Sequence, residues 1–212
     1  MAIAETQYRD DNIIADRGYV LVATAGTAAP TIQDIQTWID GGATGKLGSY
    51  TTVGHTSAES LPSVESETEG GEYKASWQNP QLRTTPTVTT STISVALLQW
   101  GEQQLKQRYG SGKFDKASGT FEAPIDYTHE PVALLVIYGD KVNKFLAMHY
   151  EKVQPSPGDS IEFSTEDFAE IGIVYKPLRA DGSNKLFSII SPILQKGNTS
   201  TPRREDSNTA DQ

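Results

Sequence analysis

Residues 87–99 have the sequence TVTTSTISVALLQ, and most of the residues up to Val95 are β-branched. Branched side chains favour the pleated backbone because they pack well on a sheet surface. This segment is therefore the strongest strand candidate in the chain. Further strands are predicted from apolar or alternating runs at 18–24, 120–125, 132–138, 142–153, 160–163, 168–175 and 186–190, with a hairpin turn at Gly139-Asp140.

The segment upstream of this strand alternates in polarity. Glu65, Glu67 and Glu69 occupy every second position, which places them on one face of a strand. Gly70-Gly71 follows and is a typical turn signal. We therefore expect residues 62–77 to form a long hairpin, polar on one side and partly apolar on the other.

Two short helices are predicted at 30–40 and 101–109. In the first, Ile32, Ile35 and Ile39 fall on one stripe, and glycines follow both segments. About eight strands with two short helices predict a mainly β fold of sandwich or barrel type. We expect an N-terminal arm at 1–17, one β domain at 18–194 and a polar C-terminal tail at 195–212.

The charge balance restricts the partners of the chain. Its 212 residues include 18 basic and 27 acidic side chains, a formal charge of −9, which has the wrong sign for gripping nucleic acid. Cysteine is absent, so disulfides and thiolate metal sites are excluded. Residues 1–17 lack the apolar core of a signal peptide, and no run approaches the length of a membrane helix. We expect synthesis and retention in a cytoplasm, without membrane insertion.

Motifs for catalysis or metal binding are not found. Residues 41–46 are rich in glycine, but Leu47 stands where a phosphate loop requires serine or threonine. His55, His129 and His149 lie in no metal-binding pattern, and His149 is expected to be an ordinary sheet residue. We expect no enzymatic activity, no catalytic residue, no metal and no cofactor.

The three alternating glutamates allow two interpretations. The simpler interpretation is a strand face exposed to solvent, and the more specific one is an acidic wall that lines an enclosed space. A long polar hairpin alone in water leaves its edges unpaired. Pairing with strands of other subunits, closed into a barrel, would remove those edges.

One stretch of the chain carries a family resemblance. Within residues 53–84, the pattern VGHTS, LP, GGE and WQNPQLRT resembles the major tail subunit, or tail tube protein, of long-tailed non-contractile phages, especially those of actinobacteria. Looser similarity extends to PTIQDIQTWIDGG at 30–42, GEQQLKQRYG at 101–110 and HYEKVQPSPGD at 149–159.

The resemblance implies a β-sandwich with a flanking helix, related to the tube protein of type VI secretion. It implies six-subunit rings stacked into a tube, with long β-hairpins forming an inner barrel through which DNA passes without specific binding. Implied partners are further copies of the chain and the tape measure, tail tip and tail terminator proteins. The implied location is the virion tail, assembled in the host cytoplasm.

Carried onto this chain, the resemblance makes Glu65, Glu67, Glu69 and Glu72 candidates for the channel wall. The hairpin around Gly139-Asp140 is a further source of inner strands. The candidates for contacts between stacked rings, in the two terminal arms, are Ile13, Ile14, Arg203 and Arg204. The alternatives are a head–tail joining protein, a decoration protein or a carbohydrate-binding β-sandwich.

Overall fold

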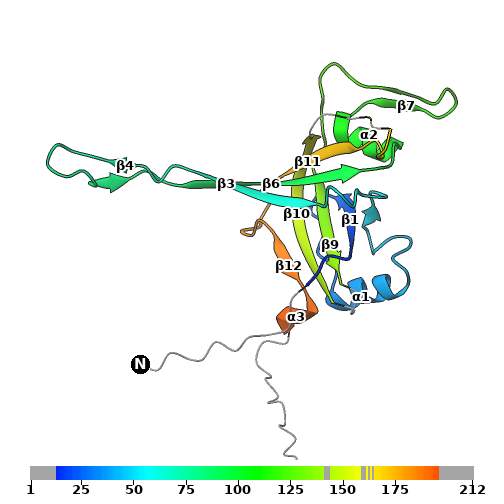
Figure 1. Ribbon diagram of the computed structural model, residues 1–212, viewed down its shortest axis with the longest axis horizontal. Coiled ribbons are helices and arrows are strands. Elements are labelled where there is room, and N and C mark those ends of the chain that lie inside the picture. The colour runs from blue at the N-terminus through cyan, green and yellow to red at the C-terminus, as the bar shows by residue number, and fades with distance from the viewer. Residues whose placement is uncertain (1–12, 141–143, 159–160, 162, 164, 196–212) are drawn as a thin grey trace, which may run out of the picture.

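The computed structural model describes residues 13–140, 144–158, 161, 163 and 165–195, and it is mainly β (Figure 1). The helices are α1 (Ile32–Asp40), α2 (Glu102–Tyr109) and α3 (Pro192–Gln195). The strands are β1 (Arg17–Thr24), β2 (Thr51–Thr52), β3 (Ser63–Glu69), β4 (Tyr73–Lys74), β5 (Arg83–Thr84), β6 (Val88–Leu97), β7 (Lys113–Asp115), β8 (Thr120–Glu122), β9 (Val132–Gly139), β10 (Phe145–Pro157), β11 (Ile171–Pro177) and β12 (Ser188–Ile190). The main sheet is antiparallel in the order β2-β1-β9-β10-β11-β6-β3, and β12 also pairs with β10.

Strand β10 folds this sheet into two layers. Its first half pairs with β9 and β12, and its second half pairs with β11. The register with β9 shifts between Tyr150 and Val153. A bulge of this kind bends the strand and increases its twist, so one strand can belong to both layers.

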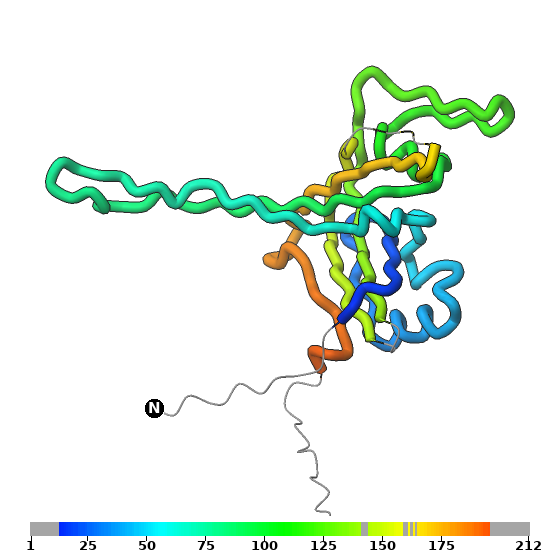
Figure 2. The backbone as a smooth tube through the Cα atoms, in the orientation of Figure 1, coloured from blue at the N-terminus to red at the C-terminus, as the bar shows by residue number. Residues whose placement is uncertain are grey.

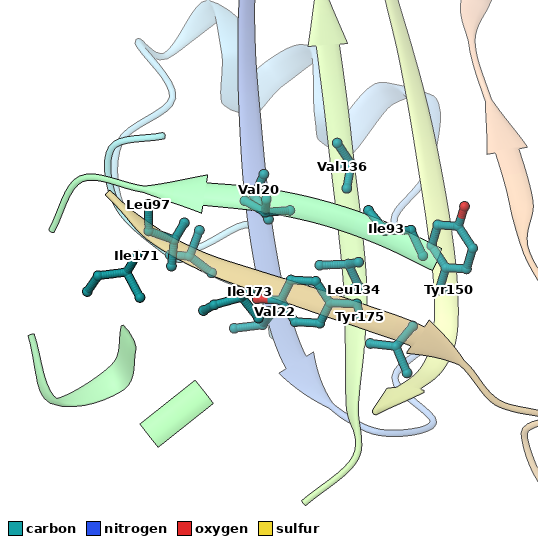
Figure 3. Close-up of a cluster of buried hydrophobic side chains, with 13 residues drawn as sticks. Val20, Val22, Ile93, Leu97, Leu134, Val136, Tyr150, Ile171, Ile173 and Tyr175 are labelled. Atoms are coloured by element: carbon teal, nitrogen blue, oxygen red, sulfur yellow. The ribbon is translucent and has the colours of Figure 1, made fainter. Parts of the chain in front are cut away.

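The main core lies between the two layers. Figure 3 shows β6 and β11 crossing β1 and β9 steeply, with the labelled apolar side chains between them. Val20 and Leu134 come from one layer, and Ile93, Ile173 and Tyr175 come from the other; all are at most 1% exposed. Such crossing is the orthogonal form of sheet packing. The predicted mainly β sandwich is confirmed.

Helix α1 covers the outer face of the β1–β9 layer. Ile35 and Trp38 are its buried residues, and they belong to a second core with Leu21 and Leu135. Thr31 caps the helix: its Oγ1 accepts a hydrogen bond from the Asp34 N–H. Because both faces of the layer are covered, β9 is buried on both sides and its residues form a continuous apolar run.

Helix α2 bonds to β11 and to the segment after β2 through polar side chains. Gln104 donates to the Val53 carbonyl at 2.6 Å, Gln107 accepts from the Tyr175 hydroxyl, and Arg108 donates to the Gly172 carbonyl. These buried groups are tolerated because each finds a partner. Gly110 ends the helix with φ +70°, and a Cβ there would lie 2.3 Å from the Thr128 carbonyl oxygen.

The predicted hairpin at 62–77 is wrong in its pairing. Strand β3 pairs with β6, from Ser63 opposite Ser94 to Glu69 opposite Val88, and the chain continues through Gly70-Gly71 without turning. Strands β4 and β5 form a second pair farther out, and the turn that reverses the chain direction lies between Ser76 and Asn79. We call residues 63–91 the arm. Figure 2 shows its outgoing and returning segments side by side, extending far from the body.

Gly70 explains why the sequence pattern was misleading. Its φ is +89°, a region that glycine adopts readily, but a Cβ there would lie 2.1 Å from the Pro86 carbonyl oxygen. This glycine therefore allows the outgoing and returning segments of the arm to approach closely, and it does not form a turn.

The other predicted elements are confirmed with changed bounds. The strands at 18–24, 132–138, 168–175 and 186–190 correspond to β1, β9, β11 and β12, and both predicted helices are present. β10 extends four residues beyond the predicted end at 153, while the strand at 120–125 shortens to β8. Of the strand predicted at 160–163, residues 161 and 163 lie outside any strand and the other two lie outside the described residues.

Candidate functional site

The three glutamates of β3 form one row on the arm. Each lies opposite a β6 residue of the same face, and all seven residues of β3 are exposed. The partners of Glu65, Glu67 and Glu69 are Thr92, Thr90 and Val88. Alternate residues of a strand are about 7 Å apart, so the carboxylates form an acidic row along the arm. The predicted common face of the three glutamates is confirmed by this register.

The opposite face of the arm carries hydroxyl groups. The Ser66 and Ser91 hydroxyls lie 3.0 Å apart, and the Thr68 and Thr89 hydroxyls lie 2.9 Å apart. Val64 lies opposite Ile93 on this same face, and Ile93 is part of the main core. The hydroxyl face is therefore the extension of the core side, and the glutamate face extends the outer side of the sheet.

The glutamate face continues onto the body. Ser63, Ser94, Val174 and Ser156 form one row across β3, β6, β11 and β10, on the outer side of the sheet. A shallow hollow of about 300 Å³ lies there, and Glu65 and Glu170 line it. The outer face of these four strands is thus polar, with small and acidic side chains and with the exposed Lys176 opposite Gln154.

The other predicted site residues do not join this row. Glu72 lies beyond Gly70-Gly71, and its carboxylate is 3.8 Å from the Lys74 ammonium. Ile13 is half-buried and Ile14 is 74% exposed. Arg203 and Arg204 lie outside the described residues.

Only part of the second hairpin, which the resemblance makes a further source of inner strands, shares the glutamate face. β9 is buried on both faces and cannot line a channel. The second half of β10 lies on the outer face with β11, so Gln154 and Ser156 are the residues of this hairpin that share the glutamate face.

Exposed aromatic side chains form a feature that the sequence did not reveal. Trp77 at the tip of the arm is 99% exposed, and Tyr73 near it is 61% exposed. At the end of β6, Trp100 stacks on Phe163 with ring centroids 6.0 Å apart. Trp100 and Phe163 are far apart in sequence, so no local pattern predicts their contact.

His149 and Ser57 are held by structural hydrogen bonds. His149 is fully buried, its Nε2 lies 2.7 Å from the Tyr50 hydroxyl, and burial lowers its pKa below the ordinary 6.5. The Ser57 hydroxyl accepts hydrogen bonds from the N–H groups of Glu59 and Ser60. Within the described residues, no group of three or more potential ligand side chains could hold a metal ion, and no helix there is long and apolar enough to cross a bilayer.

Comparison with known proteins identifies the family of this chain. The family described as phage tail tube protein matches residues 5–201. The chain is 36% identical over 174 residues to the major tail protein Gp23 of Mycobacterium phage D29, covering 77% of this chain and 83% of that protein. It is 34% identical over 177 residues to the major tail protein Gp23 of Mycobacterium phage L5, with the same shares covered. The predicted resemblance is therefore confirmed, and this chain belongs to the phage tail tube protein family, whose members are structural components of the virion tail.

Proposed function

We propose that six copies of this chain form a ring, and that stacked rings enclose the channel through which the phage genome is delivered. The observation that carries the proposal is the acidic row of Glu65, Glu67 and Glu69 on a face that the body leaves uncovered. The number six comes from the family resemblance. The role is structural, without enzymatic activity.

The strand directions are compatible with a closed barrel. β10, β11, β6 and β3 are successive antiparallel neighbours, so β3 runs opposite to β10. If β3 of one copy lies beside β10 of the next, the alternation continues around the ring without interruption. Closing the ring in this way covers the exposed edge of β3, which would otherwise invite aggregation.

The free edge of β10 favours this partner over another copy of itself. The Gly158 N–H bonds to the Gly172 carbonyl, so the backbone of alternate positions points away from β11. Pro155 and Pro157 occupy those positions and lack an N–H. Two such edges cannot pair well with each other, whereas their carbonyls can accept from the N–H groups of β3.

An acidic channel suits the passage of DNA. The duplex carries one negative charge per about 1.7 Å of axis. Carboxylates on the wall repel it, so DNA moves along the channel without lasting contacts. With the glutamate face turned to the channel, the hydroxyl face of the arm is left for contacts between subunits.

The partners and place of assembly follow the family resemblance. We infer that the tube contacts a tape measure protein, tail tip proteins and a terminator, and that it assembles in the host cytoplasm. Ile13 and Ile14, with Arg203 and Arg204, are the proposed contacts between rings from the two termini. Glu72 remains a candidate for the channel wall near the tip of the arm.

The test changes Glu65, Glu67 and Glu69 together to lysine in phage that carry the gene. Tails should still assemble, because the row faces the channel and not a neighbour, but infectivity and DNA release should fall at least tenfold. The measurements are negative-stain microscopy of tails with six-fold averaging and a plaque assay. The matched control converts exposed Glu122, Asp126 and Glu130 to lysine, the same change in charge.

Each outcome has a defined meaning. Normal infectivity of the lysine variant would show that the row does not line the channel. Rings that never stack would favour the joining-protein alternative. A glutamine version of the three substitutions separates loss of negative charge from gain of positive charge and should infect better than the lysine version.

A further inference from the structure

The arm leaves the body as a direct continuation of one layer of the sandwich. Strand β6 has exposed residues in the arm and buried core residues in the body, and Figure 1 shows it passing from one to the other without a break. The change falls at Ile93, the first buried residue of the strand. The returning segment of the arm is therefore anchored in the core, and the direction of the arm depends on what holds the outgoing segment beside it.

The outgoing segment is weakly anchored by its own side chains. All seven residues of β3 are exposed, and even Val64, the residue opposite Ile93, is 40% exposed. Among the described residues, the hydrogen bonds found along β3 all run to β6. These bonds join the two segments of the arm to each other. They stiffen the arm but do not fix its angle to the β1–β9 layer.

The Tyr138 hydroxyl links the base of the arm to that other layer. It donates a hydrogen bond of 3.0 Å to the carbonyl of Pro62, the residue directly before β3. Ser63 pairs with Ser94, next to Ile93, so the bond lies where β6 passes from the core into the arm. Since Tyr138 belongs to β9, the bond connects the arm to the layer that crosses it.

Both ends of this bond have little freedom to move. The backbone of Tyr138 pairs with Gly18 on one side and Leu146 on the other, and its ring packs against the main core. Burial raises the pKa of the Tyr138 hydroxyl above its ordinary value, so the hydroxyl stays protonated and able to donate. The ring of Pro62 fixes its φ and restricts Leu61 before it to extended conformations. A movement of the arm base therefore requires that the bond be broken.

A small rotation at the base becomes a large displacement along the arm. From Ser63 to Glu69 the strand covers about 20 Å at ~3.3 Å per residue, so a rotation of about 10° moves Glu69 by about 3–4 Å. A backbone hydrogen bond requires a donor–acceptor distance of about 2.7–3.2 Å. In the proposed ring, an arm that swings by this amount cannot remain paired with the strand of a neighbouring copy.

We propose that Tyr138 is a positioning residue for assembly: its hydroxyl, bonded to the Pro62 carbonyl, sets the angle at which the arm leaves the body and thereby the diameter of the channel. The proposal rests on the proposed ring and adds the residue that determines its dimensions. No local sequence pattern indicates this role, because the bond joins residues 76 positions apart.

The test measures the angle in the free subunit, where no neighbouring copy can impose it. Because the chain lacks cysteine, Gln33→Cys on α1 and Thr90→Cys on the arm, both exposed, can carry a pair of spin labels. The distance between the labels is measured by double electron–electron resonance. Tyr138→Phe removes only the hydroxyl, and we expect the distance distribution to become at least twice as broad.

Tyr175→Phe is the matched control. It removes another tyrosine hydroxyl, whose partner Gln107 lies in α2 and not at the base of the arm. This variant should lose stability but keep the narrow distribution of the wild type, so a general loosening of the body is distinguished from a swinging arm. In tails, Tyr138→Phe should give tubes whose diameters, measured by negative-stain microscopy, spread at least twice as widely as those of Tyr175→Phe.

The outcomes separate this inference from the proposed function. An unchanged distance distribution in Tyr138→Phe would overturn the inference, whatever the diameter of the tubes. A broad distribution in the free subunit with tubes of wild-type diameter would also overturn it, because neighbouring copies would then set the angle. Wild-type tails without rings would overturn the proposed function, while the free subunit would still show whether Tyr138 holds the arm.

Discussion

Strand β6 belongs to two regions with different physics. Its second half lies in the body, where Ile93, Val95 and Leu97 are at most 3% exposed. Its first half lies in the arm, where Val88 is 61% exposed and the hydroxyls of Thr89 and Ser91 pair with those of Thr68 and Ser66 on β3. One continuous strand therefore passes from a packed core to a ladder that has water on both faces.

The difference indicates where the energy of each region comes from. The body is stabilised within the chain, because its apolar surface is already buried. The arm has no core of its own, and a two-stranded ladder alone is only marginally stable in water. In the proposed assembly the arm gains its stability from neighbouring copies, so substitutions in the two regions should fail in different assays.

The largest expected effect is a truncation in the body. Leu134→Ala removes a fully buried side chain between the two layers, and we expect the free energy of unfolding to fall by about 2–5 kcal/mol. Val88→Ala in the arm should change it by less than about 0.5 kcal/mol. Urea denaturation of the purified subunit measures both. A comparable loss for Val88→Ala would mean that the arm is part of the folding unit.

The next effect separates the arm from the body by geometry. Gly70→Ala places a Cβ against the Pro86 carbonyl at a φ of +89°, with strain of about 1–3 kcal/mol confined to the arm. We expect faster amide exchange from β3 to β5 and loss of tubes, with the unfolding midpoint of the body unchanged.

Gly26→Ala is the matched control for this substitution. Gly26 has a similar φ of +85°, but nothing lies within 4 Å of its Cβ position. The Gly26→Ala variant should therefore form tubes normally. If Gly70→Ala assembled as well as Gly26→Ala, the close approach in the arm would have no role in assembly.

The same contrast explains what the sequence could predict. The body strands follow from apolar runs, because local pattern and tertiary burial agree there: β1, β9 and both longer helices are found near their predicted positions. The predicted pairing of the arm is wrong. Gly70-Gly71 is a local turn signal, whereas the partner of β3 is β6, which follows much later in the chain. Local propensity cannot indicate which of two distant segments closes a ladder.

The candidate site was predicted only in part for a similar reason. The common face of Glu65, Glu67 and Glu69 follows from the period of a strand and needs no partner to be known. The contact of Trp100 with Phe163 depends on the path of β10 and β11 through the body, which no spacing in the sequence reveals. That this face of the arm lines a channel stays a prediction.

A smaller effect distinguishes two tyrosines of the body. The Tyr175 hydroxyl donates to Gln107, so Tyr175→Phe leaves a buried amide oxygen without a donor, at a cost of about 1–3 kcal/mol. The Tyr150 hydroxyl is buried and has no hydrogen-bond partner among the described residues. Tyr150→Phe should leave stability unchanged or raise it slightly. Thermal unfolding of both variants tests the pair, and a larger loss for Tyr150→Phe would reverse the assignment.

The smallest effect is a pH dependence located in the body. Burial holds the pKa of His149 below its ordinary value of 6.5, while Tyr50, Glu151 and Lys185 surround it. Because the unfolded chain binds the proton first, stability is complete above about pH 6.5 and is lost as the pH falls through the folded-state pKa.

The contribution of His149 can be isolated from the slope of the unfolding free energy against pH. Lys185 also holds the pKa of Glu151 below its ordinary 4.5, so that carboxylate acts at lower pH than the histidine. Between about pH 5 and 6.5, His149→Gln should therefore flatten the decline in unfolding free energy, whereas exposed His55→Gln should keep it. Amide exchange of the arm should not follow this decline, because no side chain of the arm contacts His149 among the interactions found. An identical slope for the wild type and His149→Gln would assign the acid sensitivity to the carboxylates instead.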